Sequence, residues 1–258
     1  SDRESSMKKA KFQSFLSNKA IKFVARMNLS WRVIGFAITS LILVACTTDA
    51  DDSFDAASVC PTEGTNAYGM PNRGTFIDER DGQEYRYTTI GDQVWMAQNL
   101  NYKTYYSMNH QTFYKDCEEC GLWYNLGINF LNRDIIDSVC PTGWKVPTED
   151  DWNILLSSIG GGNQQILNVL LSEFWSEKFQ GSNTCGFNGI EAGAILAPKA
   201  EPGFLKDSTY FRGSAFWWTQ KITRPEFIEH IVFKGDDGEI LYEESFVSYF
   251  YTLRCVKK

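Results

Sequence analysis

The sequence predicts a folded domain that combines antiparallel strands with helices, and three observations support this prediction. Alternating side chains surround Asp81-Gly82, a dipeptide that favours a tight hairpin turn. Residues 148–159 carry apolar side chains at helical spacing behind a capping residue. Apolar stretches rich in aromatics return near the C-terminus, and the whole chain contains 8 Trp, 12 Tyr and 18 Phe. Such a composition favours a core that contains strands.

The first predicted element is a hairpin with one buried face. Tyr85 and Tyr87 alternate with Arg86 and Thr88, which is the period-two pattern of a strand. Residues 90–94 contain a second turn and the start of another strand. We therefore expect the folded domain to begin with paired strands.

Residues 148–159 have the clearest helical pattern of the sequence. Thr148 is the expected N-cap, and Asp151 stands at the position that completes a capping box. Three glycines at 160–162 follow the helix and end it. The apolar face has the spacing i, i+3, i+4, i+7 and consists of Trp152, Leu155, Leu156 and Ile159.

Weaker patterns complete the domain. Residues 121–137 and 164–171 carry apolar side chains at helical spacing, so we expect helices there. Residues 235–238, Gly-Asp-Asp-Gly, predict a turn between two of the closing strands. The expected closing strands are 216–220, 227–233, 240–242 and 246–257.

The N-terminal segment predicts export and lipid attachment. Residues 33–45 are an apolar run behind a basic stretch, as in a secretory signal, and the run is too short to span a bilayer comfortably. It ends in Leu-Val-Ala-Cys46, which resembles the lipobox of bacterial lipoproteins, where the cysteine receives a diacylglyceryl group and becomes the new N-terminus. We therefore expect residues 1–45 to be leader and signal peptide and Cys46 to carry the lipid. An ordinary signal anchor is the alternative.

Residues 46–73 are expected to form a disordered tether between the lipid and a domain at 74–258. They are acidic, small and without periodicity. The acidic cluster behind Cys46 also resembles the export signal that sends some lipoproteins to the outer face of the outer membrane, although a plain linker has the same composition. The predicted location is the bacterial cell envelope, as an outer-membrane lipoprotein exposed at the surface and held to the membrane by its lipid.

The domain is strongly acidic. Eight of the 25 Lys and Arg of the chain lie within residues 1–45, but only two of its 32 Asp and Glu do. Residues 46–258 therefore carry a net charge of −13. Nucleic-acid binding needs clustered basic side chains, so this balance argues against nucleic acid as a partner.

The cysteines indicate disulfides. Once Cys46 is lipidated, six cysteines remain, and an even number in an exported protein is typical of a disulfide framework. Six cysteines allow 15 pairings, and the spacing alone does not choose among them. The disulfide candidates are Cys60, Cys117, Cys120, Cys140, Cys185 and Cys255.

Cys117-Glu-Glu-Cys120 has the spacing of a metal-binding or redox pair. A zinc site needs four ligands, whereas the chain has two histidines and no second C-x-x-C. A redox pair needs a βαβ setting, and this pair lies in a polar, aromatic segment. A structural disulfide, within the pair or to other cysteines, is the favoured interpretation. We expect neither a metal nor a cofactor.

Several stretches, taken together, resemble a known bacterial family. They lie in the family's order and spacing from about residue 74 to residue 257: 81–85, 90–102, 140–147 with Asp151-Trp152, 186–187, 216–219 and 253–256. The family that they resemble is the Fibrobacter succinogenes major paralogous domain, a family of exported proteins. The sequence departs from its pattern at Cys120, where the family often has Tyr.

The Cys-Pro-x-Gly-Trp stretch at 140–144 and the closing Arg-Cys-Val also look like C-type lectin-like domains. This resemblance implies an α+β fold with two helices, a small twisted antiparallel sheet and a long loop region. It also implies a disulfide from Cys140 to Cys255 that ties back the terminal strand. The motifs of calcium-dependent sugar-binding lectins are absent, since only Glu201-Pro-Gly stands in their place.

No sequence pattern predicts catalysis. A nucleophilic triad needs Ser or Cys with His and a carboxylate, and the histidines are His110, in an expected loop, and His230, in an expected strand. No Gly-x-Ser-x-Gly is present. We therefore expect a protein that is not an enzyme.

Trp217-Trp218 is the best candidate for a ligand-binding face. Successive strand residues point to opposite sides of a sheet, so we expect at most one tryptophan in the core. The other, with Tyr210, would stack on a sugar ring or an apolar partner. Coverage of both tryptophans by loops and a helix is the alternative.

The leading hypothesis is a lipid-anchored cell-surface binding or adhesion module whose ligand is a glycan or a surface protein. A structural envelope protein without a small ligand is the first alternative. An enzyme of unknown type is the second.

Overall fold

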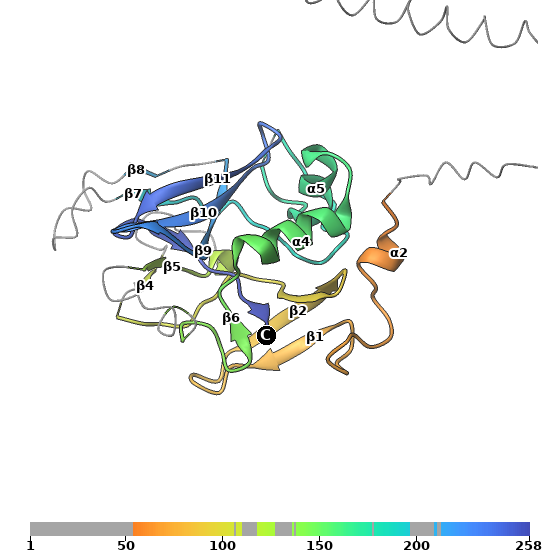
Figure 1. Cartoon of the computed structure of the whole chain (residues 1–258). Coiled ribbons are helices and arrows are strands. Elements are labelled where there is room, and N and C mark those ends of the chain that lie inside the picture. Colours follow the sequence, from red (N-terminus) through yellow and green to blue (C-terminus); the bar gives the residue numbers. More distant parts are fainter. Residues whose placement is uncertain are drawn as a thin grey trace, which may run out of the picture. The chain divides into compact units, whose positions relative to one another are not determined.

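The computed structural model describes residues 54–105, 107–109, 118–126, 136, 138–176, 178–196, 209–210 and 213–258. These residues belong to one compact unit that extends from Asp49 to Lys258. The described part consists mainly of strands, which form a five-stranded sheet and an eight-stranded sheet with three short α-helices (Figure 1).

The expected α+β fold of C-type lectin-like type, with a small sheet, is therefore wrong. Near the C-terminus, the short strand Phe250–Thr252 joins the long aromatic strands to a strand from the middle of the chain, where the sequence pattern suggested helix. Residues 122–125 form this strand instead of the expected helix. Pairing between distant segments is decided by tertiary packing and leaves no local period in the sequence.

The five-stranded sheet contains the predicted hairpin at its edge. The hairpin and its Asp-Gly turn are confirmed, because Arg73–Ile77 and Glu84–Ile90 pair antiparallel across that turn. Gly82 has φ +77°, which suits a glycine. In order across the sheet, the strands are β1 (Arg73–Ile77), β2 (Glu84–Ile90), β3 (Gln93–Met96), β13 (Val256–Lys257) and β6 (Trp144–Lys145).

The eight-stranded sheet is built around a meander of long strands. The closing strands predicted at 216–242 are confirmed, as is the turn at 235–238. The expected strand 246–257 is instead two short strands, one in each sheet. The main order is β11 (Glu239–Phe246), β10 (Phe227–Lys234), β9 (Ala215–Arg224), β12 (Phe250–Thr252), β5 (Leu122–Asn125) and β4 (Ser107–Asn109), with β7 (Ile195–Leu196) on β12 and β8 (Thr209–Tyr210) on β7.

Two of the predicted helices are present. In α4 (Glu149–Ile159) the capping box is complete, since Asp151 N donates to Thr148 Oγ1 at 3.1 Å and Thr148 N donates to Asp151 Oδ2 at 2.8 Å. The helix buries Trp152, Leu155 and Ile159 of its predicted apolar face and leaves Leu156 partly buried, and α5 (Asn163–Leu170) follows it. The remaining described helices are α2 (Ala56–Val59) and the short 3-10 helix η2 (Glu118–Cys120).

The core consists of two clusters of buried side chains on opposite faces of the eight-stranded sheet. One cluster joins α4 and α5 to the sheet through stacked aromatics, with Trp152 ring centroids 4.7 Å from Trp95 and 5.7 Å from Trp217. The other cluster contains Trp218 and Trp144. Both faces of β9 are therefore covered.

The expected tether is shorter than predicted. From Phe54 onward the segment is part of the fold, because α2 forms there and Cys60 is buried in a disulfide with Cys185. Gly91 N also donates to Val59 O at 2.7 Å. These links offset the low hydrophobicity on which the prediction of disorder depended. Residues 46–53, like the leader at 1–45, lie outside the described residues.

Within the described residues, no helix has the length and apolar character needed to span a membrane.

Candidate functional site

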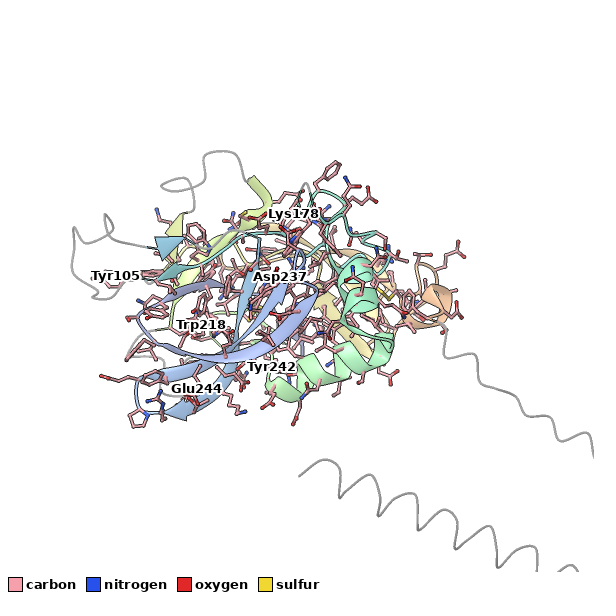
Figure 2. All side chains as sticks on the ribbon, turned by 90° about the horizontal axis from the view of Figure 1, so that it is seen from above. Tyr105, Lys178, Trp218, Asp237, Tyr242 and Glu244 are labelled. Atoms are coloured by element: carbon pink, nitrogen blue, oxygen red, sulfur yellow. A yellow bond between two sulfur atoms is a disulfide. The ribbon has the colours of Figure 1, made fainter. Side chains whose placement is uncertain are left out.

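The tryptophans predicted as a binding face are not available to a ligand. Trp217 and Trp218 are each 0% exposed, and each indole N–H already has a partner, Asn99 Oδ1 and Tyr124 O, both at 2.8 Å. Figure 2 labels Trp218 among the side chains of the sheet. The prediction fails because a core cluster packs on each face of β9, with Trp217 in the cluster that includes α4 and α5 and Trp218 in the other. The backbone of Tyr210 lies in β8, and its side chain is outside the described set.

The disulfides are the best-defined covalent features of the domain. Cys140 is bonded to Cys255, the pairing that the family resemblance implies, and Cys60 is bonded to Cys185. Cys120 is also disulfide-bonded, and its partner lies outside the described residues, as do Cys46 and Cys117. The Cys140–Cys255 bond spans 115 residues, which corresponds to about 4–5 kcal/mol in the chain-entropy model.

His230 belongs to a polar group inside the core. Its Nδ1 lies 3.2 Å from Ser245 Oγ, which lies 2.7 Å from the Tyr251 hydroxyl, and its Nε2 lies 3.7 Å from Glu243 Oε2. Burial lowers the pKa of His230 to about 4, so the ring is neutral near pH 7. Ser245 and His230 are buried and line none of the three pockets described below. The group is therefore core structure and offers no accessible nucleophile. His110 lies outside the described residues.

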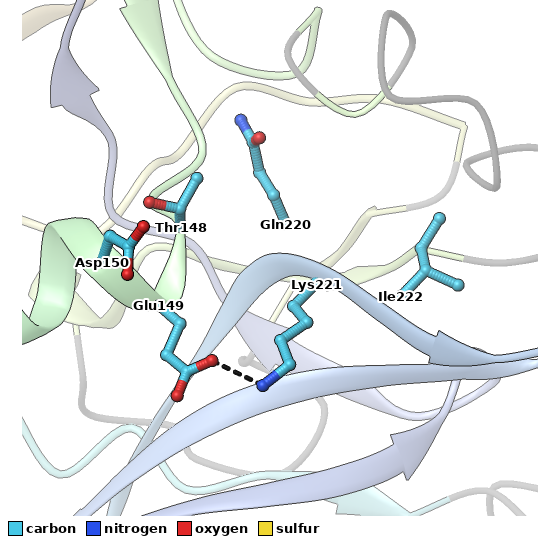
Figure 3. Close-up of a pocket in the computed structure, with 6 residues that line it drawn as sticks. All are labelled: Thr148, Glu149, Asp150, Gln220, Lys221 and Ile222. Atoms are coloured by element: carbon cyan, nitrogen blue, oxygen red, sulfur yellow. Dashed lines mark hydrogen bonds and ion pairs between the residues drawn. The ribbon is translucent and has the colours of Figure 1, made fainter.

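A first surface pocket, the Lys221 pocket, lies where the start of α4 meets β9 (Figure 3). It has a volume of about 310 Å³ and is lined by Thr148, Glu149, Asp150, Gln220, Lys221 and Ile222. Lys221 Nζ forms ion pairs with Glu149 Oε2 and Glu229 Oε2, and these hydrogen bonds raise the pKa of the lysine. The cation of this pocket is thus neutralised by the protein itself.

A second pocket, the Arg73–Arg86 pocket, has its floor on the first hairpin and a volume of about 480 Å³. Arg73 is opposite Thr88 and Thr75 is opposite Arg86 in the β1–β2 register. Because alternate residues share a face, these four side chains lie on one side of the hairpin. The buried Tyr85 and its neighbours on the other side anchor the hairpin in the core.

A loop at 183–188 forms the facing wall of the Arg73–Arg86 pocket. Asn183 has φ +47° and Asn188 has φ +53°, a left-handed conformation that Asn tolerates well. Asn188 N donates to Asn183 Oδ1 at 2.7 Å and closes the loop. Gly186 has φ +68°, and a Cβ there would lie 3.2 Å from the guanidinium carbon of Arg73. Glycine at this position therefore leaves room for Arg73.

Three links fasten this wall to the hairpin. The Cys60–Cys185 disulfide ties the loop to the segment that leads into β1. The buried Thr88 hydroxyl donates to Cys185 O at 2.6 Å, and Arg73 Nη2 donates to Thr184 O at 2.7 Å. The pocket is consequently held in shape by covalent and hydrogen bonds on both sides.

The electrostatics of the Arg73–Arg86 pocket differ from those of the domain. Within the described residues, Arg73 makes one hydrogen bond, to Thr184 O, and its Nε is buried without a partner. Burial lowers the pKa of its guanidinium. Arg86 Nη2 lies 3.5 Å from Glu119 Oε1, and both side chains are more than half exposed, so this pair is weak. No carboxylate is among the lining residues of the pocket.

Arg254 supports the same loop from inside the protein. It is fully buried, and its Nη2 donates to Asn99 Oδ1 at 2.7 Å and to Asn188 O at 3.2 Å. Its Nη1 donates to Phe187 O, and its guanidinium lies 4.3 Å from the centre of that ring. Burial lowers the pKa of Arg254 to about 9. Arg254 thus positions both the pocket loop and Asn99.

A smaller pocket of about 310 Å³ adjoins the Arg73–Arg86 pocket, and Arg86 lines both. It is also polar, and its other lining residues are Glu84, Gln98, Asn99, Asn101, Glu119 and Gly121.

Sequence reasoning missed these residues as a site. Arg86 was visible as the polar member of an alternating strand, and Arg254 as part of the closing Arg-Cys-Val. Arg73 carried no signal, because it stood in the expected tether. Within the described part, no cluster of three or more His, Cys, Asp or Glu could hold a metal ion. Cys120, as a disulfide partner, is not a metal ligand.

Comparison with known proteins identifies the family. Residues 88–257 match the family model described as the Fibrobacter succinogenes major domain, a range that includes the pocket loop, Thr88 and Arg254. No curated protein and no solved structure matches the chain. Since the family model covers more than half of the chain, this protein belongs to the Fibrobacter succinogenes major domain family.

Proposed function

We propose that this protein is a lipoprotein of the bacterial outer membrane, anchored through Cys46 and exposed at the cell surface, where its disulfide-linked domain binds a ligand. Its ligand class is a glycan or another surface protein. The proposal involves binding alone and no chemical step.

The single observation that carries the proposal is the way the Cys60–Cys185 disulfide shapes a surface pocket. Disulfides form and persist in oxidising compartments outside the cytosol. Here one of them joins the segment before β1 to the loop at 183–188, and this loop is a wall of the Arg73–Arg86 pocket. A pocket whose shape depends on a disulfide is suited to work outside the cell. The apolar run at 33–45 and the Cys46 motif point to the same compartment.

Export and anchoring are tested on the full-length chain in a Gram-negative host. We expect metabolic labelling with a fatty-acid analogue to mark the wild-type protein and not the Cys46→Ala variant. Non-reducing peptide mass spectrometry should find Cys60 linked to Cys185 in the membrane fraction. Added protease should digest the protein on intact cells if it faces outward. An unlabelled protein with free thiols in the cytosol would contradict the proposal.

Ligand binding is tested separately, with the purified full-length chain in detergent. We expect retention on immobilised polysaccharides or on isolated envelope proteins, and loss of retention when the pocket is altered by Thr75→Glu. A correctly lipidated, surface-exposed protein that is retained on neither would favour the structural alternative, an envelope protein without a small ligand.

A further inference from the structure

The charge of the Arg73–Arg86 pocket is opposite to that of the domain around it. Residues 46–258 carry a net charge of −13, yet two arginines and no carboxylate line this pocket. In an acidic domain, a pocket lined in this way is a local attractor for anions, because nearby walls of low dielectric strengthen the field inside it.

Arg73 has donors to offer. A guanidinium carries five N–H groups in a rigid planar fork that matches the two oxygens of a carboxylate. Among the described residues, Thr184 O is the only acceptor on Arg73, and its Nε is buried without one. The donors that an incoming carboxylate can reach are those on the Nη groups, because Nε is buried, and a charge-assisted hydrogen bond to them would stabilise the complex.

The other lining groups favour a ligand with hydroxyls. They include the side chains of Thr75, Asn183 and Asn188, which carry hydroxyl and amide groups, and the only aliphatic side chain among the lining residues is that of Ala97. The volume of about 480 Å³ lies within the usual range for small-ligand sites.

We propose that the Arg73–Arg86 pocket binds the carboxylate of an acidic sugar residue in an extracellular polysaccharide. Arg73 and Arg86 contact the carboxylate, and the hydroxyl and amide groups of Thr75, Asn183 and Asn188 contact the sugar hydroxyls. The inference rests on the proposed function, since the pocket meets such a polymer only outside the cell.

The test is calorimetric titration of the purified full-length chain in detergent. The probes are an oligogalacturonate, its methyl ester, a neutral xylo-oligosaccharide and a polyglutamate peptide of similar charge. We expect saturable binding of the oligogalacturonate that weakens with added salt, and binding of the methyl ester that is weaker by about tenfold or more, because a charge-assisted contact is lost.

Variants assign the binding to the pocket. Arg73→Gln and Arg86→Gln should each weaken oligogalacturonate binding about tenfold or more. Arg224→Gln is the matched control, because Arg224 is an exposed arginine paired with Glu244 away from the pocket, and it should leave the affinity unchanged. Thr75→Glu places a negative charge on the exposed floor without removing a contact of the fold, so it tests the pocket even if an arginine variant fails to fold.

Four outcomes would overturn the inference: equal binding of the methyl ester, full affinity in both Arg73→Gln and Thr75→Glu, tighter binding of polyglutamate than of the sugar, or no saturable binding of the oligogalacturonate. Polyglutamate binding would reassign the pocket to an acidic protein partner. These outcomes are distinguishable from failure of the proposed function, because lipidation and surface exposure are measured on cells and do not depend on the titration.

Discussion

The Lys221 pocket and the Arg73–Arg86 pocket each contain basic side chains from strands at the surface of an acidic domain. They differ in whether the protein itself pairs these side chains with acceptors. Lys221 is held between Glu149 and Glu229, whereas Arg73 has one backbone carbonyl within the described residues. The first arrangement satisfies its cation internally, and the second leaves donors for a ligand. The comparison teaches that the pairing of a charge, more than its presence, marks a candidate site.

The largest effect is expected from removing the Cys60–Cys185 disulfide, which shapes the Arg73–Arg86 pocket and not the Lys221 pocket. Cys60→Ser with Cys185→Ser opens a bond that spans 125 residues, so the free energy of unfolding should fall by about 4–5 kcal/mol. Urea denaturation measures this loss. Hydrogen exchange should rise at 183–188 and remain unchanged at the start of α4, next to Lys221. Equal loosening of both pockets would break the comparison.

The neutral, buried His230 should make the stability of the domain sensitive to acid, whereas Lys221 stays protonated throughout that pH range. Burial lowers the pKa of His230 to about 4 from 6.5, so the unfolded chain takes up a proton first as the pH falls. The free energy of unfolding should therefore fall by about 3 kcal/mol as the pH is lowered from 6.5 to 4, and it should be regained when the pH is returned to neutral. Urea denaturation at pH 7 and pH 4 tests this, with His230→Gln as the control that isolates the histidine from the carboxylates. The same pH dependence in both proteins would contradict the prediction.

Two glycines with a similar positive φ separate backbone strain from contact. Gly186→Ala should cost about 1–2 kcal/mol from the positive φ plus a further loss from the close contact with Arg73. Gly69 has φ +72°, and a Cβ there would meet nothing within 4 Å, so Gly69→Ala should show the backbone strain alone. The difference in unfolding free energy measures the contact. Identical costs would show that Arg73 is not confined by Gly186.

The smallest effect is expected in the Lys221 pocket. Glu149→Gln removes one exposed partner of Lys221 but leaves the ion pair to Glu229. Exposed ion pairs contribute little, so the denaturation midpoint should not change measurably. Glu149→Gln should also leave the affinity for the oligogalacturonate unchanged. A large shift in the midpoint would mean that this pocket depends on its charges more than its exposure suggests.

Local chemistry in the sequence predicted the elements that depend on it. The capping box of Thr148 and Asp151 and the turn at Asp81-Gly82 involve neighbours in the chain, and both are present. The burial of Trp217 and Trp218 depends on core clusters that pack on both faces of β9 and come from distant segments, which no local pattern encodes. Residues 122–125 became a strand for the same reason, through pairing with β4 and β12.

The candidate site was harder to predict than the fold. Arg73 is the first residue of β1, but it stood at the end of a stretch whose composition suggested disorder. Its partner wall lies more than a hundred residues away, at 183–188, and a disulfide that the sequence alone did not pair holds the two together. A site assembled from distant segments becomes visible only when the pairing of those segments is known.

The Cys60–Cys185 disulfide has a mechanical consequence. A pull on the chain from its N-terminal side reaches Cys60 and passes directly to Cys185 through the covalent bond. Residues 61–184 therefore carry no tension along the backbone and cannot be drawn out by stretching, even if their strands separate. The load arrives instead at the loop beside the pocket, which Thr88 and Arg254 hold to the rest of the domain. A ligand held in that pocket would therefore lie close to the point at which the load from the N-terminal side enters the domain.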